Sequence, residues 1–209
     1  MKRFIFLSMV IMLSIFLVSC SSQDSEANQK KEEYQAEVQA QLDTLSKKIE
    51  ALGAEVEKIG TDAVTQLSQA VDELEIQEET VNEQLEKLNM ATAESWEALR
   101  PSIEQTMDEL QQNYQQVYQQ AAEARIKQLE DQIEALRAET EQAGMAIGPE
   151  LAELIGDLET QRQSTSEQLT ELNDASAAAW TDIQVGLEAA LAELEKAYQQ
   201  ALSRFEETG

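Results

Sequence analysis

The chain has 209 residues and is strongly acidic, with 41 Asp and Glu against 15 Lys and Arg and a net charge of −26. This charge argues against a nucleic-acid partner, because nucleic acids are bound by basic faces. The chain contains no histidine and a single cysteine, which excludes a Ser-His-Asp triad and removes the usual ligands of zinc, copper and haem. We therefore expect a protein that is not an enzyme and holds no cofactor.

The composition is typical of long helices. Ala, Glu, Gln and Leu dominate, while two prolines, seven glycines and 5% aromatic residues leave little material for turns or strands. The sequence therefore predicts an all-α protein, built as an elongated antiparallel coiled coil or helical bundle.

The first twenty residues have the organisation of a secretory signal. Lys2 and Arg3 precede an apolar stretch from Phe4 to about Val18, which is shorter than the roughly 20 residues of a membrane span. The segment 17–20, Leu-Val-Ser-Cys, closes the stretch with a small residue before the cysteine. It resembles the lipobox of bacterial lipoproteins. The alternative interpretation is a single transmembrane anchor.

The lipoprotein resemblance implies a removed signal peptide over residues 1–19 and a lipidated N-terminal Cys20. Acyl chains on Cys20 would then hold the protein on a membrane. Ser21 resembles the sorting pattern that sends Gram-negative lipoproteins to the outer membrane, facing the periplasm. Residues 20–33 carry almost no apolar side chains beyond Ala27, so we expect a flexible, solvated linker there.

From residue 34 onward the chain matches itself at an offset of 84. Trp96 falls on Trp180, Tyr34 on Tyr118, and the segment 49–52 on 133–136 with the same four residues. Low complexity alone would not align tryptophans and tyrosines, so we predict an internal duplication. The two tandem 84-residue repeats would occupy residues 34–117 and 118–206.

Apolar residues in the first repeat recur every three or four positions, as in the seam of a coiled coil. The first stripe comprises Val38, Leu42, Leu45, Ile49, Leu52, Val56 and Ile59. Gly60 is expected to end it, with Thr61 or Asp62 capping the next helix. The second stripe comprises Val64, Leu67, Val71, Leu74, Val81, Leu85 and Leu88. Glu78 fills its missing step, and its repeat mate is Arg162. We interpret both charges as register-setting seam residues.

The middle of the chain predicts one long helix. Pro101 either kinks the helix around it or opens a new one. Residues 102–143 contain neither glycine nor proline and fit a helix of roughly 42 residues and about 63 Å, which joins the two repeats. The segment 144–149 is the clearest turn, and Pro149 is placed to start the next helix.

The joints at 89–92 and 173–176 leave two architectures open. If the asparagine in each joint ends a helix, each repeat is a three-helix bundle and the two bundles share a helix. If the joints stay helical, each repeat is a hairpin with one long arm, and the alanine-rich sequence that follows slightly favours this continuity. We expect Trp96 and Trp180 to be core anchors rather than a ligand platform.

A second resemblance comes from the segment 169–180, Leu-Thr-Glu-Leu-Asn-Asp-Ala-Ser-Ala-Ala-Ala-Trp, with Gly186 and Leu187 after it. It is similar to a motif of small bacterial coiled-coil stress-response proteins. The first repeat departs from the motif at Pro101 and Ser102. The resemblance implies a stress-associated helical protein that has no catalytic residues.

Together these features predict a lipid-anchored coiled-coil protein of the cell envelope, with a structural or interaction role. Its partners would be the membrane, through Cys20, and a second copy or another envelope protein. The alternative is an apolipoprotein-like or chaperone-like module, whose amphipathic helices cover lipid or other apolar cargo.

Overall fold

A computed structural model describes residues 22–60, 63–92, 94–142 and 149–208. These residues are almost entirely helical and contain no strand, so the all-α prediction is confirmed. The helices are α1 (Ser22–Val56), α2 (Ala63–Met90), the short 3-10 helix η1 (Trp96–Ala98), α3 (Arg100–Gln142), α4 (Pro149–Asn173) and α5 (Ala177–Thr208).

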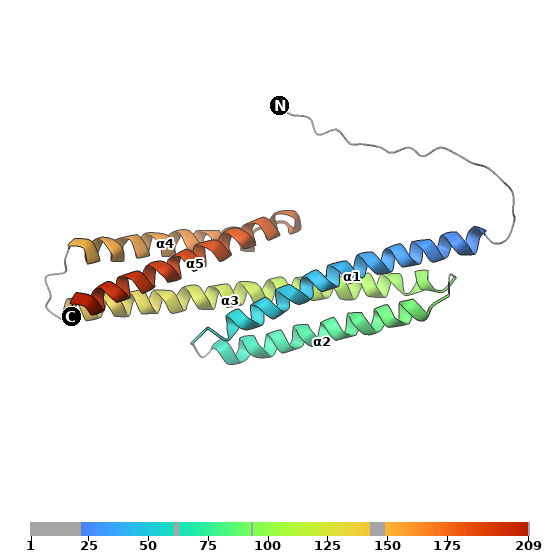
Figure 1. Ribbon diagram of the computed structural model, residues 1–209, viewed down its shortest axis with the longest axis horizontal. Helices are drawn as coiled ribbons and strands as arrows, with labels where there is room; N and C mark the ends of the chain where they lie inside the picture. The colour runs from blue at the N-terminus through green and yellow to red at the C-terminus, as the bar shows by residue number, and fades with distance from the viewer. Residues whose placement is uncertain (1–21, 61–62, 93, 143–148, 209) are drawn as a thin grey trace, which may run out of the picture.

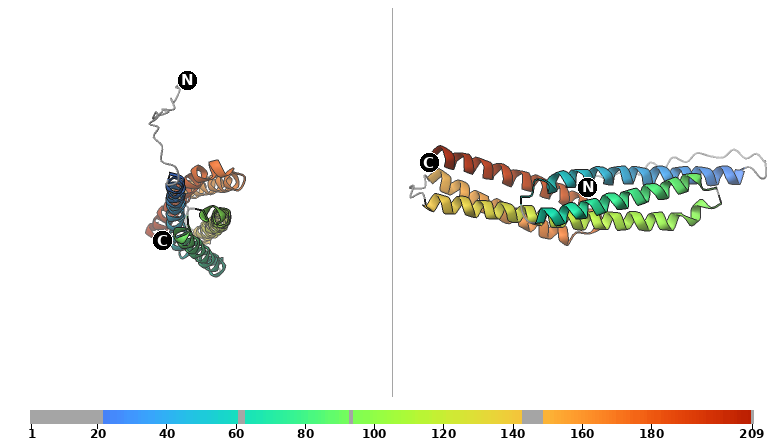
Figure 2. Two further views of the ribbon diagram at one scale, coloured as in Figure 1. Left: turned by 90° about the vertical axis from the view of Figure 1, so that its right-hand side faces the viewer. Right: turned by 90° about the horizontal axis from the view of Figure 1, so that it is seen from below.

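The helix α3 forms the spine of an elongated molecule (Figure 1). Its 43 residues span about 65 Å. Helices α1 and α2 pack along its N-terminal half, and α4 and α5 pack along its C-terminal half. The C-terminal part of α1 and the start of α5 both lie along the middle of α3, as Figure 1 and the right-hand view of Figure 2 show. The start of α1 and the end of α5 therefore lie at opposite ends of the rod.

The predicted apolar stripes form the core. Every residue of the first stripe is buried. In the second stripe every residue except Val64 is buried, and Val64 is partly buried and packs on the core. The buried apolar residues lie between Val38 and Ala201 and pack against one another. A chain of residues 21–209 therefore keeps every contact of this core. The predicted single helix through the centre is confirmed as α3, with Pro101 near its start.

Both joints interrupt the helix, so each half is a three-helix bundle and the preference for continuity was wrong. At the first joint, the Thr92 N–H donates to Ser95 Oγ at 3.0 Å, and η1 follows. At the second, the Trp180 N–H donates to Ser176 O at 3.0 Å. Helix propensity is a weak preference, and turning the chain here buries a tryptophan at each joint.

The flexible linker predicted over residues 20–33 is wrong for residues 22–33, which form the first turns of α1. Glu, Gln, Ala and Lys are good helix formers even without apolar neighbours. The pair Glu26–Lys30, at 3.1 Å, adds an i,i+4 contact. Lys31 Nζ donates to the carbonyls of Asn89 and Ala91, at 3.0 Å each. This side chain satisfies helix-end carbonyls of α2 and ties the segment to the first joint.

Two other local expectations differ in detail. Helix α1 ends at Val56, before Gly60, and a turn carries the chain on to the buried Ile59. The proposed cap at 61–62 and the turn at 144–148 lie outside the described residues, although α4 does begin at Pro149. Of the two seam charges, Arg162 is half-buried and pairs with Glu130 at 3.0 Å.

Candidate functional site: a cleft over the middle of α3

The sequence-predicted site, Cys20, and the signal peptide at 1–19 lie outside the described residues. Among the helices that the structure does describe, none combines the length and the apolar character needed to cross a membrane. Within the same residues, no three carboxylates or thiols converge on a point that would suit a metal ion.

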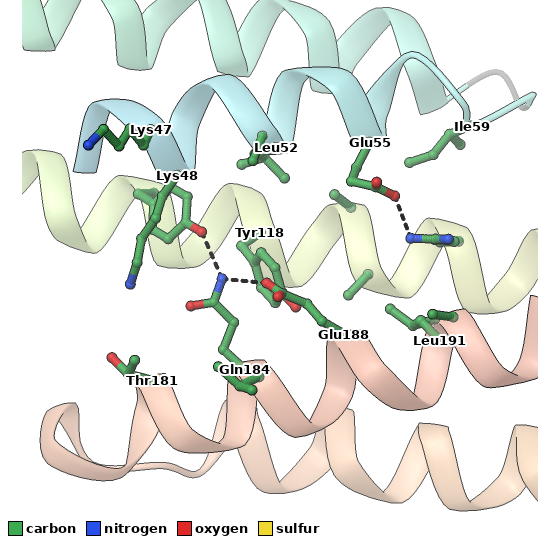
Figure 3. A pocket seen from close by; sticks show the side chains of 17 residues that line it. Lys47, Lys48, Leu52, Glu55, Ile59, Tyr118, Thr181, Gln184, Glu188 and Leu191 are labelled. Carbon is green, nitrogen blue, oxygen red and sulfur yellow. Dashed lines mark hydrogen bonds and ion pairs between the residues drawn. The ribbon is translucent and has the colours of Figure 1, made fainter. Parts of the chain in front are cut away.

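The most developed concave site is a cleft between α1 and α5, with α3 as its floor (Figure 3). It has a volume of about 460 Å³, within the range of small-molecule sites. The buried Ala121 and Ala122 form part of the floor. Their small side chains leave space where larger core residues would fill the gap between the flanking helices. Leu52 of α1 and Leu191 of α5 line the two walls.

An aromatic cluster supports the floor at one end. Tyr114 and Tyr118 of α3 line the cleft, and Trp180 of α5 packs against both rings. The centroid distances from Trp180 are 5.9 Å to Tyr114 and 5.5 Å to Tyr118, with edge-to-face geometry in both cases. Trp180 is only 4% exposed and is absent from the cleft lining. Its role is the predicted one of a core anchor, one layer behind the cleft.

A polar network beside these rings links α5 to α3. Gln184 of α5 is 5% exposed. Its Nε2 donates to the Tyr114 hydroxyl at 2.8 Å and to the Glu188 carboxylate at 2.9 Å. Such buried polar networks hold the side chains in one arrangement when their members are satisfied. The network therefore holds α5 against α3 at this point and leaves the Tyr118 hydroxyl outside it.

The Tyr118 hydroxyl is buried and has no hydrogen-bond partner among the described residues. The side chain as a whole is 8% exposed. Burial, followed by the charge of Glu188, raises the pKa of Tyr118 well above its usual range. The Glu188 carboxylate lies beside this hydroxyl and is the acceptor that its O–H would reach first. Tyr118 therefore remains a neutral donor next to a carboxylate.

The opposite end of the cleft is closed by ion pairs. Arg125 of α3 pairs with Glu55 of α1 and with Glu195 of α5, so one guanidinium links three helices. The other cations of the lining, Lys47 and Lys48, lie at the Tyr114 end (Figure 3). Lys48 Nζ is 6.0 Å from the centroid of the Tyr114 ring. Neither lysine forms an ion pair in the described part of the chain.

Comparison of the chain with protein-family models, with curated proteins and with solved structures finds no match.

Sequence reasoning did not identify the cleft. Tyr118 was recognised only as a repeat marker, Tyr114 was recognised as a repeat marker and as part of an apolar stripe, and Gln184 was not singled out. The available signal was the run of small residues at 121–122 at the centre of an otherwise regular stripe. These small residues indicate a cleft only once it is known that α1 and α5 flank the same stretch of α3.

The buried tyrosines predict a stability change at alkaline pH. Burial raises the pKa of Tyr114 to about 12, from an ordinary value of about 10. A raised folded-state pKa stabilises the fold fully below pH 10, and this contribution is lost as the pH rises toward 12. We expect the contribution of Tyr114 to the free energy of unfolding to fall on the order of 2–3 kcal/mol over that interval. Urea unfolding at several pH values measures it: Tyr114→Phe should make the slope shallower by this amount, and Tyr118, whose pKa is also raised, accounts for a further part of the slope.

Proposed function

We propose that the protein is a lipid-anchored, non-enzymatic rod of the bacterial cell envelope, held at one end by acyl chains on Cys20. The observation that supports this is the position of α1, which begins at Ser22, two residues after the proposed lipidation site, at one end of the molecule. A tether there would project a rod of about 65 Å or more away from the membrane. The charge of −26 would keep its helices off anionic lipid.

We include the internal duplication in this proposal. Tyr34 and Trp96 pack with a centroid distance of 5.8 Å. The pair 84 residues later, Tyr118 and Trp180, packs at 5.5 Å. The side chain at 100 contacts Glu104 and the side chain at 184 contacts Glu188, again at the same offset. A duplicated unit joined end to end through α3 accounts for this correspondence and for the rod shape.

The anchor is tested with the full chain expressed in a Gram-negative host. We expect it in the membrane fraction, and mass spectrometry should find an acylated N-terminal Cys20. The Cys20→Ser variant should lose both the acylation and the processed N-terminus. The matched variant Ser21→Asp keeps the cysteine and should move the protein from the outer to the inner membrane. An unmodified thiol on an uncut precursor would overturn the proposal.

The interaction role is tested by cross-linking in the same cells. Ile76 on α2 is 63% exposed and Val185 on α5 is 60% exposed, both unusual for large apolar side chains. A photoreactive side chain at either position should trap a second copy or an envelope protein. A photoreactive group at the exposed Glu75 serves as a control. If neither an oligomer nor a partner is trapped from position 76 or position 185, the proposed interaction role is wrong.

The cleft favours a second candidate function, the binding of apolar cargo in the envelope. In this function the walls and floor of the cleft would receive the cargo. Flotation of residues 21–209 with phospholipid vesicles tests the broader form, in which the helices open over a lipid surface. Absence of co-flotation would exclude that form.

A further inference from the structure

We infer that the cleft over the middle of α3 binds a single-chain amphiphile with an anionic head, of the fatty-acid class. The tail would lie over Ala121 and Ala122, and the head would face Lys47 and Lys48. This inference deepens the second candidate function and rests on it. It does not depend on acylation of Cys20.

The shape of the cleft suits one flexible chain. Its floor is made of small side chains on α3, and its walls contribute Leu52 and Leu191. Burying apolar surface is the main favourable term for such a ligand. The volume of about 460 Å³ is of small-molecule size and too small for a helix or a folded partner. A single alkyl chain is therefore the occupant that fits both the shape and the chemistry.

The charged residues of the cleft lining indicate the charge of the ligand's head group and the end of the cleft at which it would lie. On a chain of −26, the cleft places Lys47 and Lys48 together at one end without a carboxylate partner among the described residues. The third cation, Arg125, is already paired with two carboxylates at the other end. An anionic head therefore has unneutralised positive charge only at the Lys47 end, which indicates one binding orientation.

The carboxylates of the lining support the same direction. Glu188 lies beside the buried Tyr118 hydroxyl and is the acceptor nearest to hand for that donor. An anionic head would avoid Glu188 and lie toward the lysines. The unpaired cations match a carboxylate better than an alcohol or an ammonium group.

The test uses residues 21–209, which contain the whole described core, in a Trp96→Phe background. Trp180 is then the only tryptophan, and it contacts the Tyr118 ring of the cleft. We expect laurate, added below its micellar concentration, to change the Trp180 fluorescence in a saturable manner, with one laurate bound per chain by calorimetry. Dodecanol and dodecyltrimethylammonium, which carry a twelve-carbon tail as laurate does, should bind about tenfold more weakly.

Matched variants separate the cleft from the rest of the surface. Ala51 lines the cleft and is exposed, whereas Ala54 is exposed outside it. Ala51→Phe should therefore weaken laurate binding about tenfold or more, while Ala54→Phe should leave it unchanged. Circular dichroism on each variant confirms that the helices are intact.

A second pair of variants tests the head group. The double variant Lys47→Gln with Lys48→Gln should weaken laurate binding about fivefold and reduce its preference over dodecanol to about twofold. Changing Lys87 and Lys127 to glutamine alters the net charge equally, away from the cleft, and should have no effect. Laurate binding that resists Ala51→Phe, or that exceeds one molecule per chain, overturns the inference. If vesicles bind and laurate does not, this inference falls alone; if neither binds, the second candidate function falls with it.

Discussion

Proline at position 120 is expected to lower the free energy of unfolding by about 3 kcal/mol or more. Gln120 is exposed on α3, in the stretch that both bundles share. The substitution removes one backbone donor and places the proline ring against the carbonyl of Gln116. Since α3 belongs to both bundles, the kink would disturb the packing of α1 and α2 on one half and of α4 and α5 on the other.

Urea unfolding followed by circular dichroism measures the effect. The unsubstituted chain should unfold in one transition, because neither bundle is complete without α3. Gln120→Ala changes the same side chain and should be neutral within about 0.5 kcal/mol. Gln23→Pro places proline in the first turn of α1, where the N–H has no helical acceptor, and should also be tolerated. A loss below about 1 kcal/mol for Gln120→Pro would mean that the bundles do not depend on an unbroken α3.

The long-range architecture was largely predictable because apolar periodicity and the absence of helix breakers act locally. The stripe from Val38 to Ile59 is the core face of α1 and the segment leaving it, and the Gly- and Pro-free window became α3. These features depend only on residues that are neighbours within one helix, so they can be recognised in the sequence itself. The boundaries moved by a few residues, as at Val56, because tertiary contacts decide where a helix end is satisfied.

The joints were not predictable, since their outcome depends on partners distant in the sequence. The Lys31 ammonium reaches carbonyls about sixty residues later, and the Trp96 ring needs Tyr34 beside it. Local helix propensity favoured a continuous helix because it takes no account of these two long-range contacts. The same reasoning explains why the linker prediction failed. The segment 22–33 lacks an apolar stripe, yet it is helical, and its Lys31 is hydrogen-bonded to the first joint.

The cleft illustrates the same limit for a site. Its residues come from three helices, and none of them stands out in its own helix. Lys48, Ala122 and Gln184 are separated by more than sixty residues at each step. Only the overlap of α1 and α5 along α3 brings them together. Sequence reasoning can propose a site carried by one contiguous motif, as it does at Cys20, but not one made by the stagger of two bundles.

Trp180→Ala is the second large effect that we expect, a loss of about 3–5 kcal/mol in the free energy of unfolding. Trp180 is 4% exposed and packs against two tyrosine rings of α3. Truncation would leave a cavity behind Tyr114 and Tyr118, and α5 would lose its main anchor near its start. Because those rings form part of the cleft floor, the variant should also weaken laurate binding.

Trp96 is the matched comparison, since it occupies the equivalent position of the first half and is also 4% exposed. Within the described part of the chain it packs against one aromatic ring, that of Tyr34. An aromatic pair contributes about 0.5–1.5 kcal/mol beyond its buried area. Trp96→Ala should therefore cost about 1 kcal/mol less than Trp180→Ala and should leave laurate binding intact. Equal losses of stability and of binding in both variants would contradict the view that Trp180 supports the cleft while Trp96 supports only the first joint.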